Sequence, residues 1–345
     1  MRMNRLGETT INVSEICLGS MTWGQQNSRR EAFAQMDYAC DQGINFFDTA
    51  ELYAIPPKAE TYGATESIIG EWFKQHGRRH EIILASKVCG PTAWCPHIRS
   101  GKAKLNREHI IAACDASLQR LQCDHIDLYQ THWPERSTNY FGKLNYSHSE
   151  EAFTPIDETV EALSTLVDAG KVRHIGISNE TPWGAMQYLR AAEQAGLSRI
   201  VSIQNPYSLL NRSFEIGLAE IACREKVGLL AYSPLAFGVL SGKYLNDKAP
   251  KNGRLSLFNH YSRYSNNFGK LATEAYVNVA NKHGLKPAQM ALAFIRNQSF
   301  VTSTIIGATT MQQLKENIGS CEVKLSDACI TDIEAVFQQY PNPCP

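Results

Sequence analysis

Three strand-like runs of this sequence each end on side chains that can take part in acid–base chemistry. These side chains are Asp48 and Tyr53 in FFDTAELY, Lys87 at the end of LASK, and His132 in YQTHW. Burying an unpaired charge is costly, so an apolar strand has no packing reason to end on one. When successive strands do so, a shared site at one end of a sheet is the simplest explanation.

Together these side chains fit the chemistry of a proton donor. A tyrosine phenol titrates at about 10 in water, and an adjacent lysine ammonium favours the phenolate and lowers the phenol pKa. Asp48 would keep Lys87 charged and in place, and His132 would hydrogen-bond the reacting oxygen or pass on the proton. Taken singly, each residue has a plainer interpretation as a turn former, a strand-end lysine or a loop histidine. Their coincidence predicts a catalytic group.

The elements that must position this group alternate regularly between short β-rich runs and longer helical patterns. Such alternation predicts a parallel sheet with crossover helices, and eight repeats favour a closed (β/α)8 TIM barrel over an open doubly wound sheet. The expected strands are ICLGS from 16, INFFD from 44, EIILASK from 81, HIDLYQTH from 125, VRHIGIS from 172, RIVSIQN from 199, GLLAYSP from 228 and VTSTIIG from 301.

We expect a single domain over residues 1–345, with a β-hairpin in 1–15 before the barrel and long loops at 133–155 and 235–268. Active sites on this fold lie at the carboxyl ends of the strands and in the loops that follow. Because neighbouring parallel strands lie about 4.8 Å apart, residues that end successive strands can meet. The predicted catalytic residues satisfy this requirement.

The composition is that of an ordinary enzyme for small molecules. Lysine plus arginine equals aspartate plus glutamate, at 34 each, so no net charge favours nucleic acid or a membrane surface. Ten cysteines without a CxxC pair indicate reduced thiols in a cytoplasm rather than a zinc site or a disulfide framework. The polar Met1–Arg5 segment leads into no signal or membrane span. The sequence leaves the oligomeric state open.

A phosphate site is expected after the last two strands. No GxGxxG follows any strand, which disfavours a Rossmann-type site. The small residues between Ser233 and Tyr244 let backbone amides approach an anion, and Lys243 adds a charge. In GATTMQQLKEN, from Gly307, Thr309 or Thr310 is expected to cap a helix, which by itself would be an ordinary exposed helix.

The order, spacing and strand placement of Asp48, Tyr53, Lys87 and His132 match the catalytic tetrad of the aldo-keto reductases, which the chain resembles along nearly its whole length. The resemblance implies NADPH-dependent reduction of an aldehyde or ketone to an alcohol. Hydride would reach the carbonyl carbon while Tyr53 protonates the oxygen.

The resemblance also implies a set of residues that bind the cofactor. In the family, positions matching Ser178, Asn179 and Gln204 bind the nicotinamide carboxamide, and an aromatic residue matching Tyr232 stacks on the ring. Without the resemblance, Asn179 is equally a cap for the helix expected near Pro182, and Tyr232 an ordinary core aromatic. The further implied contacts are Ser20, Met21, Ser233, Pro234, Leu235, Ala236, Gly238, Leu240, Lys243, Arg254, Gly307, Thr309, Gln313, Glu316 and Asn317.

The chain departs from the family pattern at one cofactor position. Many members have a Lys-Ser pair where this chain has Thr309 and Thr310, and that lysine helps to bind the 2′-phosphate of the adenosine. Preference for NADP(H) would then depend on Lys243 and Arg254, whose side chains suit phosphate.

The expected substrate pocket is aromatic. An apolar pocket over the nicotinamide would be lined by aromatic residues, although the same residues would serve equally to pack the loops: Trp23, Trp94, Trp133, Tyr140 and Phe141.

Two other functions remain open. One alternative to a reductase is a nicotinamide-binding regulatory module that turns over slowly. The other is a metal-dependent hydrolase, which needs several convergent ligands, whereas only His132 falls at a strand end.

Overall fold

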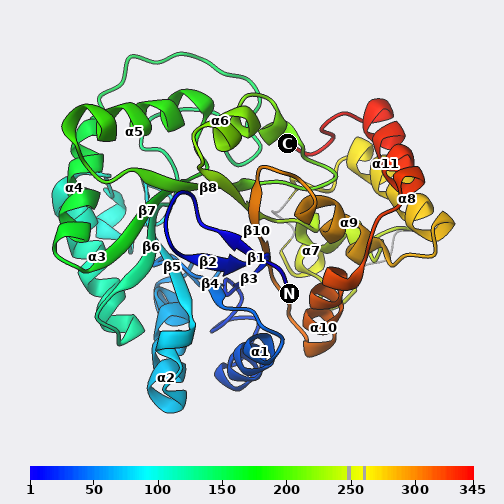
Figure 1. Ribbon diagram of the computed structural model, residues 1–345, viewed down its shortest axis with the longest axis horizontal. Coiled ribbons are helices and arrows are strands. Elements are labelled where there is room, and N and C mark those ends of the chain that lie inside the picture. Colours follow the sequence, from blue (N-terminus) through cyan, green and yellow to red (C-terminus); the bar gives the residue numbers. More distant parts are fainter. Residues whose placement is uncertain (247–249, 259–261) are drawn as a thin grey trace.

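The computed structural model describes residues 1–246, 250–258 and 262–345, and its centre is a closed barrel of parallel strands (Figure 1). The strands neighbour one another in the order β10-β3-β4-β5-β6-β7-β8-β9. They span β3 (Ile16–Gly19), β4 (Phe46–Asp48), β5 (Ile83–Val88), β6 (Ile126–Thr131), β7 (Val172–Ser178), β8 (Ile200–Pro206), β9 (Gly228–Tyr232) and β10 (Val301–Ile306). The predicted (β/α)8 barrel is confirmed.

Helices surround the barrel and connect its strands. They are α1 (Arg29–Asp41), α2 (Ala64–His76), α3 (Arg107–Leu121), α4 (Ile156–Asp168), α5 (Pro182–Ala195), α6 (Leu218–Arg224), α7 (Arg254–Leu257), α8 (Asn267–Lys282), α9 (Pro287–Arg296), α10 (Met311–Gly319) and α11 (Asp327–Gln339). Short 3-10 helices lie between them: η1 (Ala59–Thr61), η2 (Arg79–Glu81), η3 (Arg99–Gly101), η4 (Ser213–Glu215), η5 (Ala236–Ser241) and η6 (Ser320–Glu322). At the right of Figure 1, α8 and α11 pack against each other.

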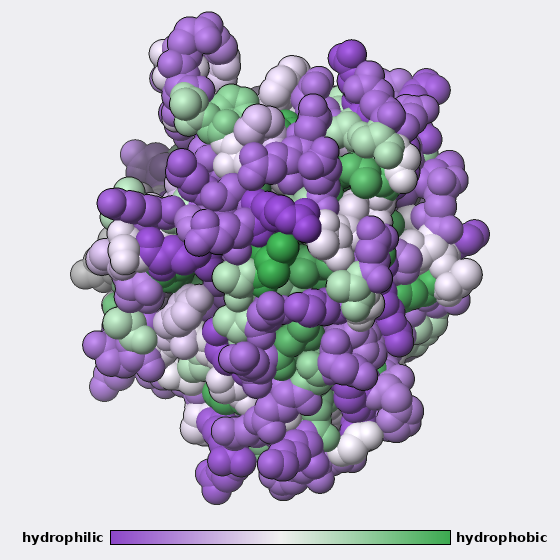
Figure 2. Space-filling view, turned by 90° about the vertical axis from the view of Figure 1, so that its left-hand side faces the viewer, coloured by the Kyte–Doolittle hydropathy of each residue, from purple (hydrophilic) through white to green (hydrophobic). Residues whose placement is uncertain are grey.

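The helices are amphipathic, and side chains fix several of their starts. In α4, Val160, Leu163 and Leu166 are buried, whereas Glu161 is exposed. Figure 2 shows the side of the molecule on which α3 and α4 lie in Figure 1, and hydrophilic residues cover most of it. At α1, Ser28 and Glu31 form a capping box. No helix in the described ranges is long and apolar enough to cross a bilayer.

The predicted N-terminal hairpin is present and covers one end of the barrel. It pairs β1 (Met3–Arg5) with β2 (Asn12–Ser14) in antiparallel fashion. Leu6 and Val13, both fully buried, pack with residues that fill the barrel, among them Phe46 and Leu128. Asn45, just before β4, accepts a hydrogen bond from the Ser14 amide, so the hairpin closes the amino-terminal end of the barrel. The opposite, carboxyl end is left for the site.

Strand register and long loops shape that open end. Gly19 lies beside Asp48, Asp48 beside Ala85, and Lys87 beside Gln130. The loop after β6 contains no helix or strand until α4 begins, and the loop after β9 contains η5 and α7. Within the predicted loop at 235–268, residues 247–249 and 259–261 lie outside the described residues.

Candidate active site

A buried ion pair stands at the centre of the open end of the barrel. Lys87 Nζ lies 2.7 Å from Asp48 Oδ2 and donates to the Thr49 carbonyl at 2.7 Å. The Lys87 side chain is fully buried. Burial alone would lower the pKa of Lys87, but Asp48 and the Tyr53 oxygen outweigh it and raise that pKa above its usual value. Lys87 is therefore charged at neutral pH, as the sequence predicts.

Tyr53 lies next to this pair, with its phenol oxygen 3.5 Å from Lys87 Nζ. The pKa of Tyr53 is shifted in the direction opposite to the one expected from the sequence. Burial raises the pKa of Tyr53 above 10, and the Lys87 charge, which lowers it, offsets burial only in part. The predicted lowering of the phenol pKa is wrong in its net direction, because it left out desolvation. Tyr53 keeps its proton at neutral pH.

His132 faces Tyr53, with the two ring centroids 5.7 Å apart. Burial, assisted by the Lys87 charge, lowers the pKa of His132 well below its usual value. Its Nδ1 is buried and has no hydrogen-bond partner among the described residues. His132 is thus a neutral imidazole that can donate one hydrogen bond and accept another.

Residues that end β7, β8 and β9 join this group through hydrogen bonds. Gln204 Nε2 donates to Asp48 Oδ1 at 2.8 Å, and Ser178 Oγ donates to the Gln204 carbonyl at 2.7 Å. Asn179 Nδ2 donates to the His132 carbonyl at 2.8 Å, and Asn179 Oδ1 accepts from the Tyr232 hydroxyl at 2.5 Å. The hydrogen bond from Gln204 to the Asp48 carboxylate was not expected from the sequence.

Asn179 lies within this network, and it does not cap the next helix. The N-cap of α5 is Thr181, whose side chain accepts from the Gly184 amide. Asn179 has a φ of 56°, in the left-handed region that asparagine tolerates better than most residues. Of the two alternatives for this residue, the cap is excluded, and binding of a cofactor stays a prediction.

Ser20 and Met21 hold the ends of β3 and β4 together. Ser20 Oγ donates to the Asp48 carbonyl at 2.7 Å, and the Met21 carbonyl accepts from the Ile55 amide at 2.9 Å. Arg254 of α7 reaches the same region, with Nη1 3.8 Å from Met21 Sδ. Arg254 is also among the groups that act on the pKa of Tyr53. The arginine therefore lies at the mouth of the site.

The segment after β9 turns sharply through η5. Positive φ angles recur at Ser233, Ala236 and Gly238. A Cβ on Gly238 would lie 2.7 Å from Lys243 Nζ, so glycine is required there for Lys243 to lie across the turn. Pro234, Leu235 and Leu240 belong to the same segment.

Lys243 is half-buried, and burial lowers its pKa below the usual value. Within the described ranges, no carboxylate lies at ion-pair distance from its Nζ. A partly desolvated ammonium of this kind gains from a bound anion.

The segment after β10 leads into α10. Thr310, not Thr309, caps this helix by accepting from the Gln313 amide. Thr309 instead donates from its backbone amide to Gln313 Oε1 at 2.9 Å. A Cβ on Gly307 would meet no atom within 4 Å, so space is open beside the end of β10. Asn317 Nδ2 donates to the Gly307 carbonyl at 3.3 Å, whereas Glu316 pairs with Lys286.

Aromatic rings extend outward from His132. Its ring lies 4.8 Å from Trp133, which lies 5.8 Å from Trp94 and 6.0 Å from Phe141. Trp94 is 57% exposed and Phe141 48% exposed. Tyr140 packs on Phe141, with ring centroids 5.0 Å apart.

Trp23 does not belong to these rings, so of the two roles open to it, packing is the one observed. It is fully buried in the layer between barrel and helices, where its Nε1 donates to Gln35 of α1 at 3.0 Å. The other four aromatic residues of the prediction form the cluster that adjoins His132.

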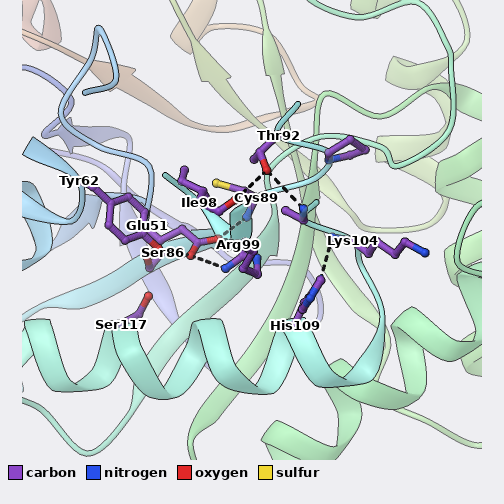
Figure 3. Close-up of polar contacts among 12 residues, drawn as sticks. Glu51, Tyr62, Ser86, Cys89, Thr92, Ile98, Arg99, Lys104, His109 and Ser117 are labelled. Atoms are coloured by element: carbon purple, nitrogen blue, oxygen red, sulfur yellow. Dashed lines mark hydrogen bonds and ion pairs between the residues drawn. The ribbon is translucent and has the colours of Figure 1, made fainter. Parts of the chain in front are cut away.

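Sequence reasoning also missed a second buried ion pair, shown in Figure 3. Glu51, between Asp48 and Tyr53 in the chain, accepts from Arg99 Nη2 at 2.6 Å and from Arg99 Nη1 at 2.9 Å. The sequence gives one hint of this pair, the carboxylate of Glu51 in the loop that carries Tyr53. As for metals, no cluster of three His, Cys, Asp or Glu side chains suited to an ion occurs among the described residues.

Comparisons with known proteins agree with this geometry. The model of the Aldo/keto reductase family matches residues 15–338. The chain belongs to this family. It is 52% identical to Protein tas of Escherichia coli over the full length of both chains. It is 32% identical to the aldo-keto reductase yakc [NADP(+)] of Schizosaccharomyces pombe, covering 94% of this chain and 90% of that one. It is also 31% identical to a probable voltage-gated potassium channel subunit beta of rice, covering 99% of this chain and 98% of that one.

Membership in the aldo/keto reductase family implies an oxidoreductase that uses a nicotinamide cofactor. The residues present fit such a group. Amide and hydroxyl groups of Ser178, Asn179 and Gln204 converge at the ends of β7 and β8, beside the Tyr232 ring. Beyond them lie a half-buried lysine and the open space at Gly307. The predicted contact of each residue with the cofactor stays a prediction.

The neutral state of His132 in this aldo/keto reductase gives a pH-dependent stability. Unfolded, His132 binds a proton below a pH of about 6.5, whereas the folded protein resists protonation to a lower pH. The stability that a neutral His132 contributes is therefore present above pH 6.5 and is lost as the pH falls below it. Between about pH 7 and 5.5, we expect wild type to lose about 1 kcal/mol more unfolding free energy in urea than His132→Gln. Equal losses would mean that His132 is not held neutral.

Proposed function

We propose that this protein is a cytoplasmic, NADPH-dependent reductase of aldehydes and ketones, with Tyr53 as the proton donor. The observation that carries the proposal is the contact of a protonated phenol with a buried, charged lysine and a neutral histidine at one barrel end. The free state of all ten cysteines supports a reducing compartment.

In the proposed reaction, each residue of the group has a separate task. Tyr53 holds the proton that the carbonyl oxygen receives, and His132 hydrogen-bonds the same oxygen and orients it. Lys87 stabilises the phenolate that remains after the transfer, and Asp48 keeps Lys87 charged and directed at Tyr53. When bound, NADPH supplies the hydride for the carbonyl carbon.

The cofactor would be held along the ends of β7 to β10. Ser178, Asn179 and Gln204 offer hydrogen bonds for the carboxamide, and Tyr232 offers a ring face for the nicotinamide. Lys243 and Arg254 would bind phosphates of the adenosine half, because both lie in the segment after β9 and carry positive charge.

The substrate that fits this site best is an apolar, aromatic carbonyl compound. The exposed rings of Trp94 and Phe141 continue from the buried His132 and Trp133 without a gap. Two large apolar side chains that remain half exposed beside a catalytic group gain from an aromatic ligand.

Replacing Tyr53 with Phe removes only the proton donor. We expect kcat for carbonyl reduction to fall by at least about 100-fold, while the Kd of NADPH, measured by quenching of protein fluorescence, stays within about twofold of wild type. Tyr340→Phe, at the end of α11, is the matched loss of one hydroxyl and should change neither value. Equal turnover of Tyr53→Phe and wild type would overturn the assignment. Tight NADPH binding without turnover of any carbonyl by wild type would favour the regulatory alternative.

Replacing Lys243 with Met tests the basis of cofactor preference. Because Lys243 is proposed to bind the 2′-phosphate, the Kd of NADPH should rise about tenfold and that of NADH should change little. Lys282→Met, at an exposed ion pair of α8, serves as the matched control. A similar loss for both cofactors would place Lys243 on a phosphate that they share.

Replacing Phe141 with Ala tests the substrate class. We expect KM to rise about tenfold for an aromatic aldehyde such as 4-nitrobenzaldehyde, with little change for propanal, because the ring contact is lost only by the larger substrate. Phe268→Ala, which removes an exposed ring from α8, is the control. If both aldehydes respond alike, the aromatic rings do not select the substrate.

A further inference from the structure

The Glu51 carboxylate is fully buried, yet the proposed chemistry does not use it. Besides the two bonds from Arg99, it accepts one from the Cys89 amide at 2.7 Å and one from the Tyr62 hydroxyl at 2.8 Å. In Figure 3, Tyr62 and Arg99 lie on either side of Glu51, above helix α3. Every acceptor position of this carboxylate is thus engaged by a fixed partner.

The carboxylate is ionised despite its burial. Burial by itself raises the pKa of Glu51, but the bonds and charge of Arg99, together with the Cys89 amide, outweigh it and lower that pKa below its usual value. A buried charge with this many bonds is rigidly held, because any displacement leaves it unpaired in an apolar surrounding.

The partners of Glu51 belong to the segments that carry the proton donor and its lysine. The Glu51 amide donates to the Lys87 carbonyl at 3.3 Å, and its carboxylate binds Cys89, two residues beyond Lys87. Tyr53 follows Glu51 by two residues in the same loop. Glu51 therefore ties the loop that bears Tyr53 to the end of β5.

Arg99 belongs to a loop whose backbone needs such an anchor. Arg99 has a φ of 45° and Ser100 a φ of 53°, both in the left-handed region that is unfavourable for residues with a side chain. The bidentate contact with Glu51 fixes this turn against the barrel.

We propose that the Glu51–Arg99 pair is the positioning element for Tyr53, which holds the phenol oxygen within reach of Lys87; the proposal rests on the proposed function. Neither residue contacts the phenol oxygen, so both act through the loop. The distance of 3.5 Å between Tyr53 and Lys87 is at the outer limit of a hydrogen bond, and a small shift of the loop breaks the contact.

The same barrel contains a matched control pair at its other end. Asp127 is fully buried and accepts from Arg79 Nη2 at 2.8 Å and from the Leu84 amide of β5 at 2.9 Å. Glu51 thus binds an arginine and the backbone just past the carboxyl end of β5. Asp127 binds Arg79, the backbone near the amino end of the same strand and, at 2.8 Å, a second arginine, Arg173. Only the first pair adjoins Tyr53.

The test compares Glu51→Gln and Arg99→Lys with Asp127→Asn and Arg79→Lys. With saturating NADPH and carbonyl, we expect kcat of the first two to fall about tenfold and KM values to stay within about twofold. The deuterium isotope effect with cofactor labelled at the transferred position should rise, because proton and hydride transfer become rate-limiting. Asp127→Asn and Arg79→Lys should lower Tm and leave kcat and the isotope effect unchanged.

A second measurement does not depend on turnover. Hydrogen exchange of a peptide covering residues 49–54 should accelerate in Glu51→Gln and Arg99→Lys, but not in the two controls. If a single variant fails to fold, Glu51→Gln/Arg99→Gln, which leaves no unpaired charge, takes its place in both measurements.

Retention of kcat and of slow exchange at residues 49–54 in folded Glu51→Gln would overturn the proposal and leave the pair a purely structural role. If wild type reduces no carbonyl compound, the proposed function fails, and hydrogen exchange alone then decides whether the pair anchors the loop.

Discussion

The ion pair between Lys87 and Asp48 is the interaction on which the rest of the site depends. Both side chains are removed from water, and the loss of hydration of two such charges can exceed their mutual attraction. Further hydrogen bonds to both partners offset this loss. Thr49 and Tyr53 complete the contacts of Lys87, and Gln204 completes those of Asp48. The pair thus determines which residues must end β8 and begin the loop after β4.

The need to pair a buried charge recurs next to the Lys87–Asp48 pair. Glu51 is buried beside the inner pair and needs its own cation, which Arg99 supplies from the loop after β5. Asp48 begins the short segment that leads to Tyr53, and Glu51 lies within it, so an ion pair anchors this segment at two points. Loops are more mobile than strands as a rule, whereas this one is joined to β5 by the bonds of Glu51 to the Lys87 carbonyl and the Cys89 amide. Such contacts suit a loop that carries the proposed proton donor, Tyr53.

Local pattern in the sequence was sufficient for the barrel and for bringing Asp48, Tyr53, Lys87 and His132 to one end of it, but not for the contacts around them. The eight expected strands agree with the observed ones within two residues at their ends, since each is a short apolar run bounded by polar residues. The proposed catalytic residues were recognisable because a charge at a strand end is unusual. The sequence could not choose between the pocket and packing for Trp23, because its partner, Gln35, lies on a helix whose position the sequence does not reveal. Glu51 and Arg99 are 48 residues apart and follow no periodic pattern, so nothing in the sequence pairs them.

The pKa of Tyr53 shows how such long-range contacts change the interpretation of the site. From the sequence, Lys87 was expected to make the phenol more acidic before reaction. In the structure, burial dominates and the phenol stays protonated, so the charge of Lys87 acts mainly on the phenolate that the proton transfer leaves behind. Before reaction the charges of Asp48 and Lys87 cancel, and Tyr53 and His132 are neutral. Negative charge that develops on Tyr53 during the proposed transfer is then drawn to a lysine already in place. This interaction is stronger in the transition state than in the ground state, which is what catalysis requires of it.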